Sequence, residues 1–330
     1  MAKAYDRMEW GFLEGMLLAL GFTRGWVDLV LVCVSSVRYN VMVNGEAAGT
    51  RKESQGLLHG VKVARGAPPV SHLFFANDSL LFFKATDVEA QAVRECLDRY
   101  GQALGQLVNF DKSSIMYSTN TMSGVRDRVG ASFGVQEVEG FGRYLGLPSF
   151  LGRNRTSVFR YIEQKVRERV SSWQKKLLSR VGKEVLLKSV AQAMPILSMS
   201  VFLLPTVICA SIENMMNRFW WQHGGATRRG LHWLSWRCMA LPKSCGSMGF
   251  KRLREFNVAL LAKQVWRILT APESLTTRVL KARYFFPNDC FLKARLGSNP
   301  SYIWRSILAG QDLLRKGVVR RVGDGADTLI

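Results

Sequence analysis

Residues 70–83 consist of two apolar runs that are separated by the small polar pair Asn77 and Asp78. The runs have the length of β-strands, and a short polar step between two apolar runs favours a tight turn, so the segment predicts a β-hairpin. A carboxylate at the tip of such a turn can face the phosphates of a nucleotide through Mg²⁺. The pattern is equally typical of a simple structural hairpin, and the local sequence leaves both interpretations open.

The hairpin and seven further segments resemble the reverse transcriptases of non-LTR (LINE-type) retrotransposons, most closely those of flowering plants. Its core reads Phe-Ala-Asn-Asp where the family has Phe-Ala-Asp-Asp, so Asn77 takes the place of the first aspartate. The other segments are, in order, 3–7 (KAYDR), 60–69 (GVKVARGAPP), 108–113 (VNFDKS), 144–148 (YLGLP), 218–221 (RFWW), 229–233 (RGLHW) and 249–253 (GFKRL). Each segment alone is weak, but seven in sequence order are specific.

This resemblance implies RNA-directed DNA synthesis, in which carboxylates hold Mg²⁺ ions between the primer and the incoming triphosphate. It places the second aspartate of the hairpin at Asp78, which would be the metal ligand, and a lysine near the leaving phosphates at Lys112. Tyr5 matches the aromatic residue that screens the 2′ position of the sugar. Ordinary packing and ordinary surface charge are the alternative interpretations of Tyr5 and Lys112.

Three departures from the family pattern predict a catalytically inactive copy. Asn77 removes one carboxylate, and the chain begins inside the motif that carries the upstream aspartate of the family. A template- and nucleotide-positioning loop of the family is missing between Gly45 and Gly60. We therefore expect no functional Mg²⁺ and no small-molecule substrate. The alternatives are a helical protein-interaction module derived from the element and a genomic relic without a selected function.

Periodicity divides the chain near residue 150. The first part interleaves strands and helices, whereas the second part shows helical spacing throughout. We therefore predict an α+β remnant of a polymerase palm over residues 1–150 and a mainly helical thumb and connector over 151–330. The expected elements are helices at 6–20, 25–35 and 87–100, with Val88, Ala92, Cys96 and Tyr100 on one face of the last, and strands at 38–43, 60–63, near 108 and at 115–117.

A net charge of +21 and a pI near 10.1 favour an anionic partner, with nucleic acid preferred to an acidic membrane. Between Arg153 and Lys188 eleven Lys and Arg residues stand against three Glu, and apolar residues recur at steps of three and four from Val158 to Leu177. The pattern predicts a helix with a basic stripe opposite an apolar face, which would bind RNA and DNA through their phosphates without sequence preference. The predicted phosphate-binding residues are Arg153, Arg155, Arg160, Lys165, Arg167, Arg169, Lys175 and Lys176. A solvated face on a core helix is the alternative.

Most tryptophan and cysteine residues are predicted to pack in the core. Trp220, Trp221, Trp233 and Trp236 are expected to pack in the core, with one of the four exposed. The six cysteines show no Cys-x-x-Cys spacing, so we expect most to be buried and none to start a zinc site.

No apolar run has the length of a membrane-spanning or secretory segment, so we expect no membrane partner and an intracellular protein of the nucleus or cytoplasm. A flexible joint is expected at Gly224 and Gly225.

Overall fold

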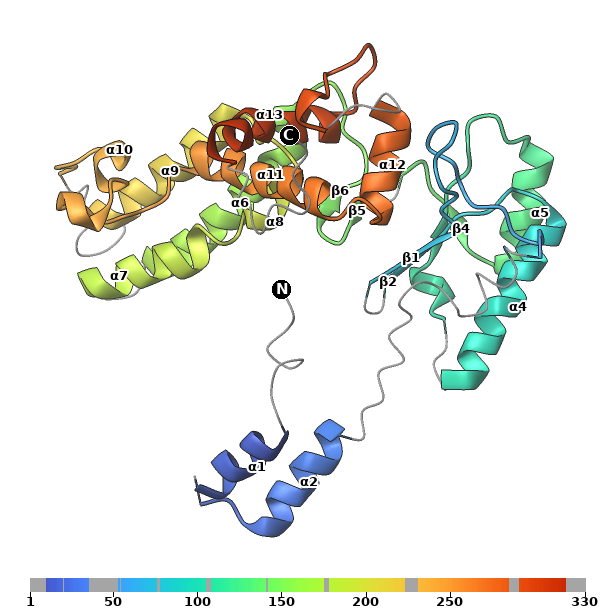
Figure 1. Ribbon diagram of the computed structural model, residues 1–330, viewed down its shortest axis with the longest axis horizontal. Helices are drawn as coiled ribbons and strands as arrows, with labels where there is room; N and C mark the ends of the chain where they lie inside the picture. Colours follow the sequence, from blue (N-terminus) through green and yellow to red (C-terminus); the bar gives the residue numbers. More distant parts are fainter. Residues whose placement is uncertain are drawn as a thin grey trace, which may run out of the picture. The chain divides into compact units, whose positions relative to one another are not determined.

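The computed structural model describes residues 10–19, 21–35, 53, 55–75, 78–104, 108–140, 142–174, 178–222, 231–284 and 291–318. Four predicted site residues lie outside this described part: Tyr5, Asn77, Lys175 and Lys176. The strand predicted at 38–43 and the joint predicted at 224–225 also lie outside it. The chain divides into two compact units, Met1–Gly56 and Leu57–Ile330, and each is described by itself (Figure 1). The predicted division at residue 150 stays a prediction.

The first unit contains two helices, α1 (Trp10–Ala19) and α2 (Arg24–Ser35). They connect through Gly21, whose φ of 86° lies in the left-handed region that glycine adopts without strain. The Arg24 guanidinium pairs with Glu14 at 2.9 Å and ties the start of α2 to α1. Both predicted helices are therefore confirmed within the described residues.

The second unit contains the two paired strands of the predicted hairpin, but Asp78, predicted at the turn, belongs to a strand. Strand β1 (His72–Phe75) pairs antiparallel with β2 (Asp78–Leu81), so that Phe75 faces Asp78 across the tip and His72 faces Leu81 at the base. Leu73, Phe74 and Phe75 are exposed. The hairpin thus forms a two-stranded sheet whose apolar side chains are poorly covered, which leaves it with little hydrophobic stabilisation.

Two other strand predictions differ from the structure. Near residue 108 the chain forms a 3₁₀ turn, η2 (Phe110–Lys112), because the Asn109 side chain accepts a hydrogen bond from the Lys112 amide at 3.1 Å. Such local capping competes with strand pairing. At 60–63 a single bridge joins Val61 to Val70 instead of a strand. The strand predicted at 115–117 is shorter, because β3 covers Ser114–Ile115 and pairs parallel with β4 (Gln136–Glu137).

Helix α4 (Asp87–Leu104) is present where the sequence predicts it, but its buried face differs. On the predicted face Ala92 is buried as expected, but Val88 is 67% exposed and Tyr100 is also exposed, whereas Glu89, Ala90 and Val93 outside that face are buried. Glu89 explains the rotation, because its carboxylate accepts hydrogen bonds from the backbone amides of His59 at 3.1 Å and Lys84 at 2.9 Å. A buried acceptor with several donors therefore outweighs the apolar spacing. Helix α5 (Ser123–Phe133) packs beside α4.

A tight hairpin of β5 (Arg143–Tyr144) and β6 (Leu147–Pro148) precedes the helical part of the unit. Both turn residues, Leu145 and Gly146, have positive φ, at 51° and 78°. This combination defines a type I′ turn, which matches the twist of the two strands. The remaining helices are α6 (Arg155–Gln174), α7 (Arg180–Leu186), α8 (Ile196–Met199), α9 (Thr206–Trp221), α10 (Trp236–Met239), α11 (Leu253–Thr270), α12 (Leu275–Tyr284) and α13 (Tyr302–Gly317), with short η3 (Leu187–Ala191), η4 (Lys243–Cys245) and η5 (Phe291–Lys293).

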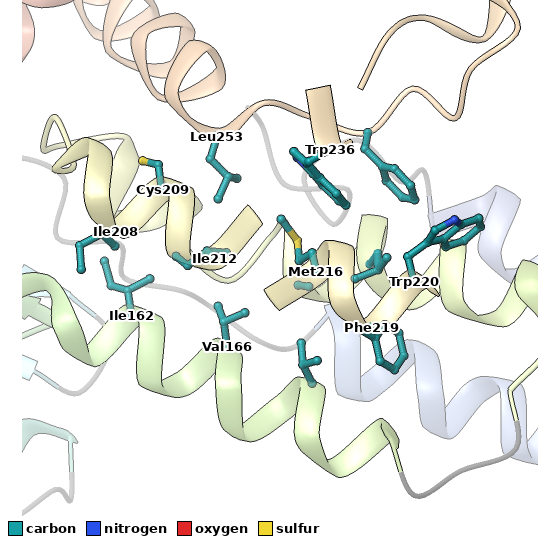
Figure 2. Close-up of a cluster of buried hydrophobic side chains, with 14 of the residues drawn as sticks. Ile162, Val166, Ile208, Cys209, Ile212, Met216, Phe219, Trp220, Trp236 and Leu253 are labelled. Carbon is teal, nitrogen blue, oxygen red and sulfur yellow. The ribbon is translucent and has the colours of Figure 1, made fainter. Parts of the chain in front are cut away.

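The main core lies between α6 and α9. The apolar spacing predicted for α6 is confirmed, because Ile162, Val166 and Val170 are buried. Figure 2 shows Ile162 and Val166 pointing toward Ile208 and Ile212 of α9. Phe159, which the spacing does not include, is completely buried beside them. Burying one such side chain contributes roughly 1.5–3 kcal/mol, so this helix pair accounts for much of the stability of the unit.

A second core lies where α11 packs on α13. Gly310 of α13 makes this approach possible, since a Cβ there would lie 2.3 Å from the Ala262 nitrogen and 2.6 Å from the Leu261 carbonyl carbon. Trp304 is completely buried and stacks on Tyr284 with ring centroids 4.5 Å apart. Ser301 caps the start of α13, because its hydroxyl accepts a hydrogen bond from the Trp304 amide.

The aromatic prediction is confirmed for the region 218–237. Trp220, Trp221 and Trp236 are buried, and Trp233 is 74% exposed. The prediction that most cysteines are buried is wrong for three of the cysteines whose burial the structure describes: Cys209 is buried as predicted, but Cys96 is half-buried and Cys238 and Cys245 are exposed. Among the described residues no helix is long and apolar enough to span a membrane.

Candidate nucleic-acid interface

The two predicted catalytic residues that the structure describes, Asp78 and Lys112, lie in different elements. Asp78 is the first residue of β2 and its side chain is exposed, and Lys112 ends the η2 turn and is also exposed. Within the described part of the chain no hydrogen bond or ion pair joins Asp78 to Lys112. The structure therefore places both residues on the surface and does not bring them together through a direct contact.

The described part of the hairpin supplies one carboxylate, Asp78, toward a possible Mg²⁺ site. A Mg²⁺ ion takes six oxygen ligands and usually one or two carboxylates, and polymerase chemistry needs two ions. Over the residues that the structure covers, no group of three or more His, Cys, Asp or Glu side chains converges on a possible metal position. Asp78 alone does not supply such a set, so we derive no catalytic step through a metal.

Helix α6 presents most of the predicted cations to solvent. Asn154 starts the helix, because its side chain accepts a hydrogen bond from the Ser157 amide at 3.1 Å. Arg160 and Arg167 are seven residues apart, or two turns, and lie on one flank of the buried stripe. Lys165 and Arg169 are four residues apart and lie on the other flank. The cations therefore occupy both flanks, and not a single stripe opposite the apolar face as the sequence predicts.

The cations of α6 are largely unpaired. Arg167 bonds to Glu163 at 2.7 Å, and Glu163 also accepts a hydrogen bond from Ser211 of α9 at 2.8 Å. No ion pair forms at the other five predicted cations that the structure covers, which are Arg153, Arg155, Arg160, Lys165 and Arg169. Exposed cations without acidic partners on both flanks of α6 produce a positive potential that attracts polyanions.

The cations that follow α6 have a structural function instead. Lys183 donates hydrogen bonds to the carbonyl oxygens of Phe219 and Gln222, and Arg180 donates to the Trp220 carbonyl at 2.8 Å. These carbonyls form the free end of α9, where positive groups are stabilising. Burial lowers the pKa of Lys183, and the nearby Arg180 lowers it further. Lys188 bonds to Glu184 and to the Met248 carbonyl, each at 2.7 Å. The number of basic residues in 153–188 thus exceeds the number available to a ligand.

Arg143 extends the exposed basic surface, and it is not among the predicted phosphate-binding residues. Its guanidinium lies 3.8 Å from the centroid of the Tyr161 ring on α6. The Tyr161 hydroxyl is fixed by a hydrogen bond to the Gly146 carbonyl at 3.2 Å and another with Ser198 at 2.9 Å. Arg143 and Tyr161 are far apart in sequence and belong to different elements. No spacing signal could have identified this contact.

Two proteins of Arabidopsis thaliana are similar to the chain. The chain is 39% identical over 139 residues to the "Uncharacterized mitochondrial protein AtMg00310", and the match covers 89% of that protein and 42% of this chain. The chain belongs to the family of this plant protein. The shared family supports a plant origin for the sequence.

The second relative is a much longer protein. It is named "Putative ribonuclease H protein At1g65750", and it is 34% identical over 182 residues, which are 54% of this chain. The chain spans only 29% of the length of that protein. No protein-family model matches the chain.

Proposed function

We propose that this chain derives from the reverse transcriptase of a plant non-LTR retrotransposon, is inactive as a polymerase, and retains non-specific binding to the backbones of RNA and DNA. The observation that carries the binding proposal is the set of five exposed cations at and on α6 without an acidic partner, extended by Arg143. Such cations bind backbone phosphates, and these contacts do not depend on the base sequence.

The relatives support the proposal in a limited way. Both are plant proteins. The name of one relative includes the word ribonuclease, and a ribonuclease acts on RNA. The ordered segments that resemble the reverse transcriptase family support a polymerase origin independently of these names. A palm and thumb architecture for residues 1–150 and 151–330 is part of this proposal.

The binding proposal predicts a steep dependence of affinity on salt. Each neutralised phosphate adds about 0.7–0.9 to the slope of log K against log salt concentration, so several contacts give a slope of about −3 or steeper. Fluorescence anisotropy of the full chain with labelled single-stranded RNA and duplex DNA of several sequences measures this slope. Similar affinities for all sequences are expected, and absence of binding at low salt or a flat salt response would contradict the proposal.

A charge-matched pair of variants locates the binding surface. The triple substitution R160Q/K165Q/R169Q removes three cations from α6, and K263Q/R267Q/R278Q removes three exposed cations from α11 and α12. We expect the first to reduce the salt slope by about 2–3, since phosphate contacts are lost, and the second to change it by less than about 1. Equal effects would indicate a general charge attraction and not an interface on α6.

The polymerase proposal predicts no primer extension on an RNA template with Mg²⁺ or Mn²⁺. Asn77→Asp alone should not restore activity, because the positioning loop of the family is still missing between Gly45 and Gly60, and correct orientation accounts for many kcal/mol of a barrier. Extension above background by the unmodified chain would contradict the proposed inactivity. Extension only after Asn77→Asp would show that the missing loop matters little.

A protein-interaction module is the second candidate, and one observation favours it. Leu231 and Trp233 are each about three-quarters exposed, and Leu234 beside them is half exposed. Exposed apolar groups of this size often mark a protein contact. Binding to a protein partner that does not weaken with salt would favour this candidate over nucleic-acid binding.

A further inference from the structure

A groove of about 440 Å³ opens at the start of α6, and three arginines line it: Arg153, Arg155 and Arg254. Its other walls come from Asn154, from Tyr302 at the start of α13, and from residues 203–206 at the start of α9. Arg254 belongs to α11, so the groove joins four segments that are distant in sequence. No carboxylate lies among the lining residues, and we call this feature the arginine groove.

The floor of the arginine groove is fixed by buried hydrogen bonds. Asn257 is completely buried, and its amide oxygen accepts a hydrogen bond from the Leu204 amide at 2.8 Å. Its amide nitrogen donates to the carbonyls of Met199 at 2.7 Å and Phe202 at 2.9 Å. Ser306 accepts a hydrogen bond from the Leu203 amide at 2.9 Å. A floor held this way needs little rearrangement when a ligand binds, which lowers the free-energy cost of binding.

Contacts orient two of these arginines and leave N–H groups of each available to a ligand. The Arg155 guanidinium lies over the Tyr302 ring at 4.4 Å from its centroid, so the ring fixes its plane without using its N–H groups. Tyr302 is itself held by a hydrogen bond from its hydroxyl to the Leu203 carbonyl. Arg254 donates one Nη1 hydrogen bond to the Leu204 carbonyl at 2.8 Å and has further N–H groups. A guanidinium fixed in this way can bind two oxygens of one phosphate.

The shape and charge of the groove favour an extended phosphate-bearing ligand. It is open to solvent and lined mainly by polar groups, unlike the enclosed apolar pockets that bind small molecules. Helix α9 also begins there at Pro205, which has no side-chain cap, so the positive end of that helix contributes to the potential. The exposed Arg160 continues the positive surface along α6 beyond the groove.

We propose that the arginine groove binds a backbone phosphate of RNA or DNA through Arg153, Arg155 and Arg254, and thereby fixes the position of the strand on α6. This inference rests on the proposed nucleic-acid binding and adds a specific site to it. Arg254 and Tyr302 are absent from the residues that sequence reasoning selects. The structure alone brings them to the start of α6.

Charge-conserving substitutions test the groove directly. In R153K/R155K the net charge is unchanged, but lysine cannot bind two phosphate oxygens through a planar fork or stack on Tyr302 in the same way. We expect the affinity for a labelled single-stranded RNA to fall about tenfold. The matched control R267K/R278K, at exposed positions of α11 and α12 outside the groove, should change the affinity less than about twofold. Circular dichroism checks that all variants of the full chain remain folded.

The outcomes separate the two proposals. If the unmodified chain does not bind RNA, the proposed function and the groove are both wrong. If it binds and the two lysine pairs weaken binding equally, or neither weakens it, the groove proposal alone is wrong. Vesicles of anionic phospholipid provide the last comparison, because a loss of vesicle binding without a loss of RNA binding in R153K/R155K would assign the groove to a lipid phosphate and overturn the proposal.

Discussion

Residues 57–150 and residues 151–318 of the second unit differ in how their apolar residues are used. In the first region the described strands form three two-stranded sheets, and Leu73, Phe74 and Phe75 remain exposed. In the second, α6 and α9 bury a continuous row of large side chains, and Phe219 is only 1% exposed. An amphipathic helix completes its core by packing on one other helix, whereas a two-stranded hairpin needs a covering layer to bury its apolar side chains. Most of the hydrophobic stabilisation therefore belongs to the helical region.

The charged residues of the two regions also differ in what they contact. In 57–150 the carboxylate of Glu89 is buried, accepts hydrogen bonds from two backbone amides, and serves the local fold. In the helical region the cations divide into two sets, because Arg180 and Lys183 hold the end of α9 while Arg160 and Lys165 face solvent. A basic sequence thus contains both structural and available cations, and only the contacts distinguish them.

The largest expected effect comes from two phenylalanines in contrasting positions. Phe219→Ala removes a buried ring from the α6–α9 core and should lower the free energy of unfolding by about 3–5 kcal/mol. Phe75→Ala removes the same atoms from a side chain that is 62% exposed, and should change it by less than about 0.5 kcal/mol. Urea denaturation followed by circular dichroism measures both. Similar losses would show that the hairpin is covered in solution.

A second pair of substitutions compares glycines in helices of the two regions. Gly310→Ala places a methyl group against the α11 backbone and should destabilise the chain by about 1–3 kcal/mol, or more if the helices cannot separate. At Gly130 in α5 the nearest atom to an added Cβ is the Tyr117 hydroxyl at 3.7 Å, an ordinary contact. Gly130→Ala should therefore be neutral or stabilising by up to about 1 kcal/mol. Thermal unfolding temperatures distinguish these signs, and a tolerated Gly310→Ala would contradict the close packing of α11 on α13.

The third prediction concerns the buried carboxylate of Glu89. Burial raises the pKa of its carboxyl, but the His59 and Lys84 amides and the His59 imidazole, 2.8 Å from it, outweigh burial and leave the pKa below the ordinary value of 4.5. The contribution of the carboxylate to stability is therefore complete above about pH 4.5 and is lost as the pH falls through the folded-state pKa. Glu89→Gln should cost about 1–3 kcal/mol at pH 7.

The pH dependence of this substitution provides its control. The difference in unfolding free energy between the unmodified chain and Glu89→Gln should shrink as the pH falls below about 4.5. Asp98→Asn, at an exposed position on the same helix, should change the unfolding free energy by less than about 0.5 kcal/mol at every pH. A difference for Glu89→Gln that stays constant down to pH 3 would show that charge is not the cause.

Sequence reasoning succeeded where a periodic apolar pattern coincides with burial. The spacing from Val158 to Trp173 predicts α6 and its buried face, and the two apolar runs predict the hairpin. It failed where a polar side chain decides the local structure: Asn109 caps a turn in place of a strand, and Glu89 rotates the buried face of α4. The contacts of Arg143 with Tyr161 and of Arg155 with Tyr302 join residues from different elements, so no spacing in the sequence encodes them.

Hydrogen–deuterium exchange of the full chain, with and without single-stranded RNA, tests the contrast between the two regions most directly. Without RNA the amides of α6, α9 and α11 should exchange slowest, and those of residues 72–81 much faster, because they have little buried apolar contact. RNA should slow exchange further at the start of α6 and leave the hairpin unchanged. Slow exchange at 72–81 equal to that of α9 would contradict the poor covering of the hairpin, and RNA protection centred on the hairpin would contradict the proposed binding of nucleic acid by the helical region.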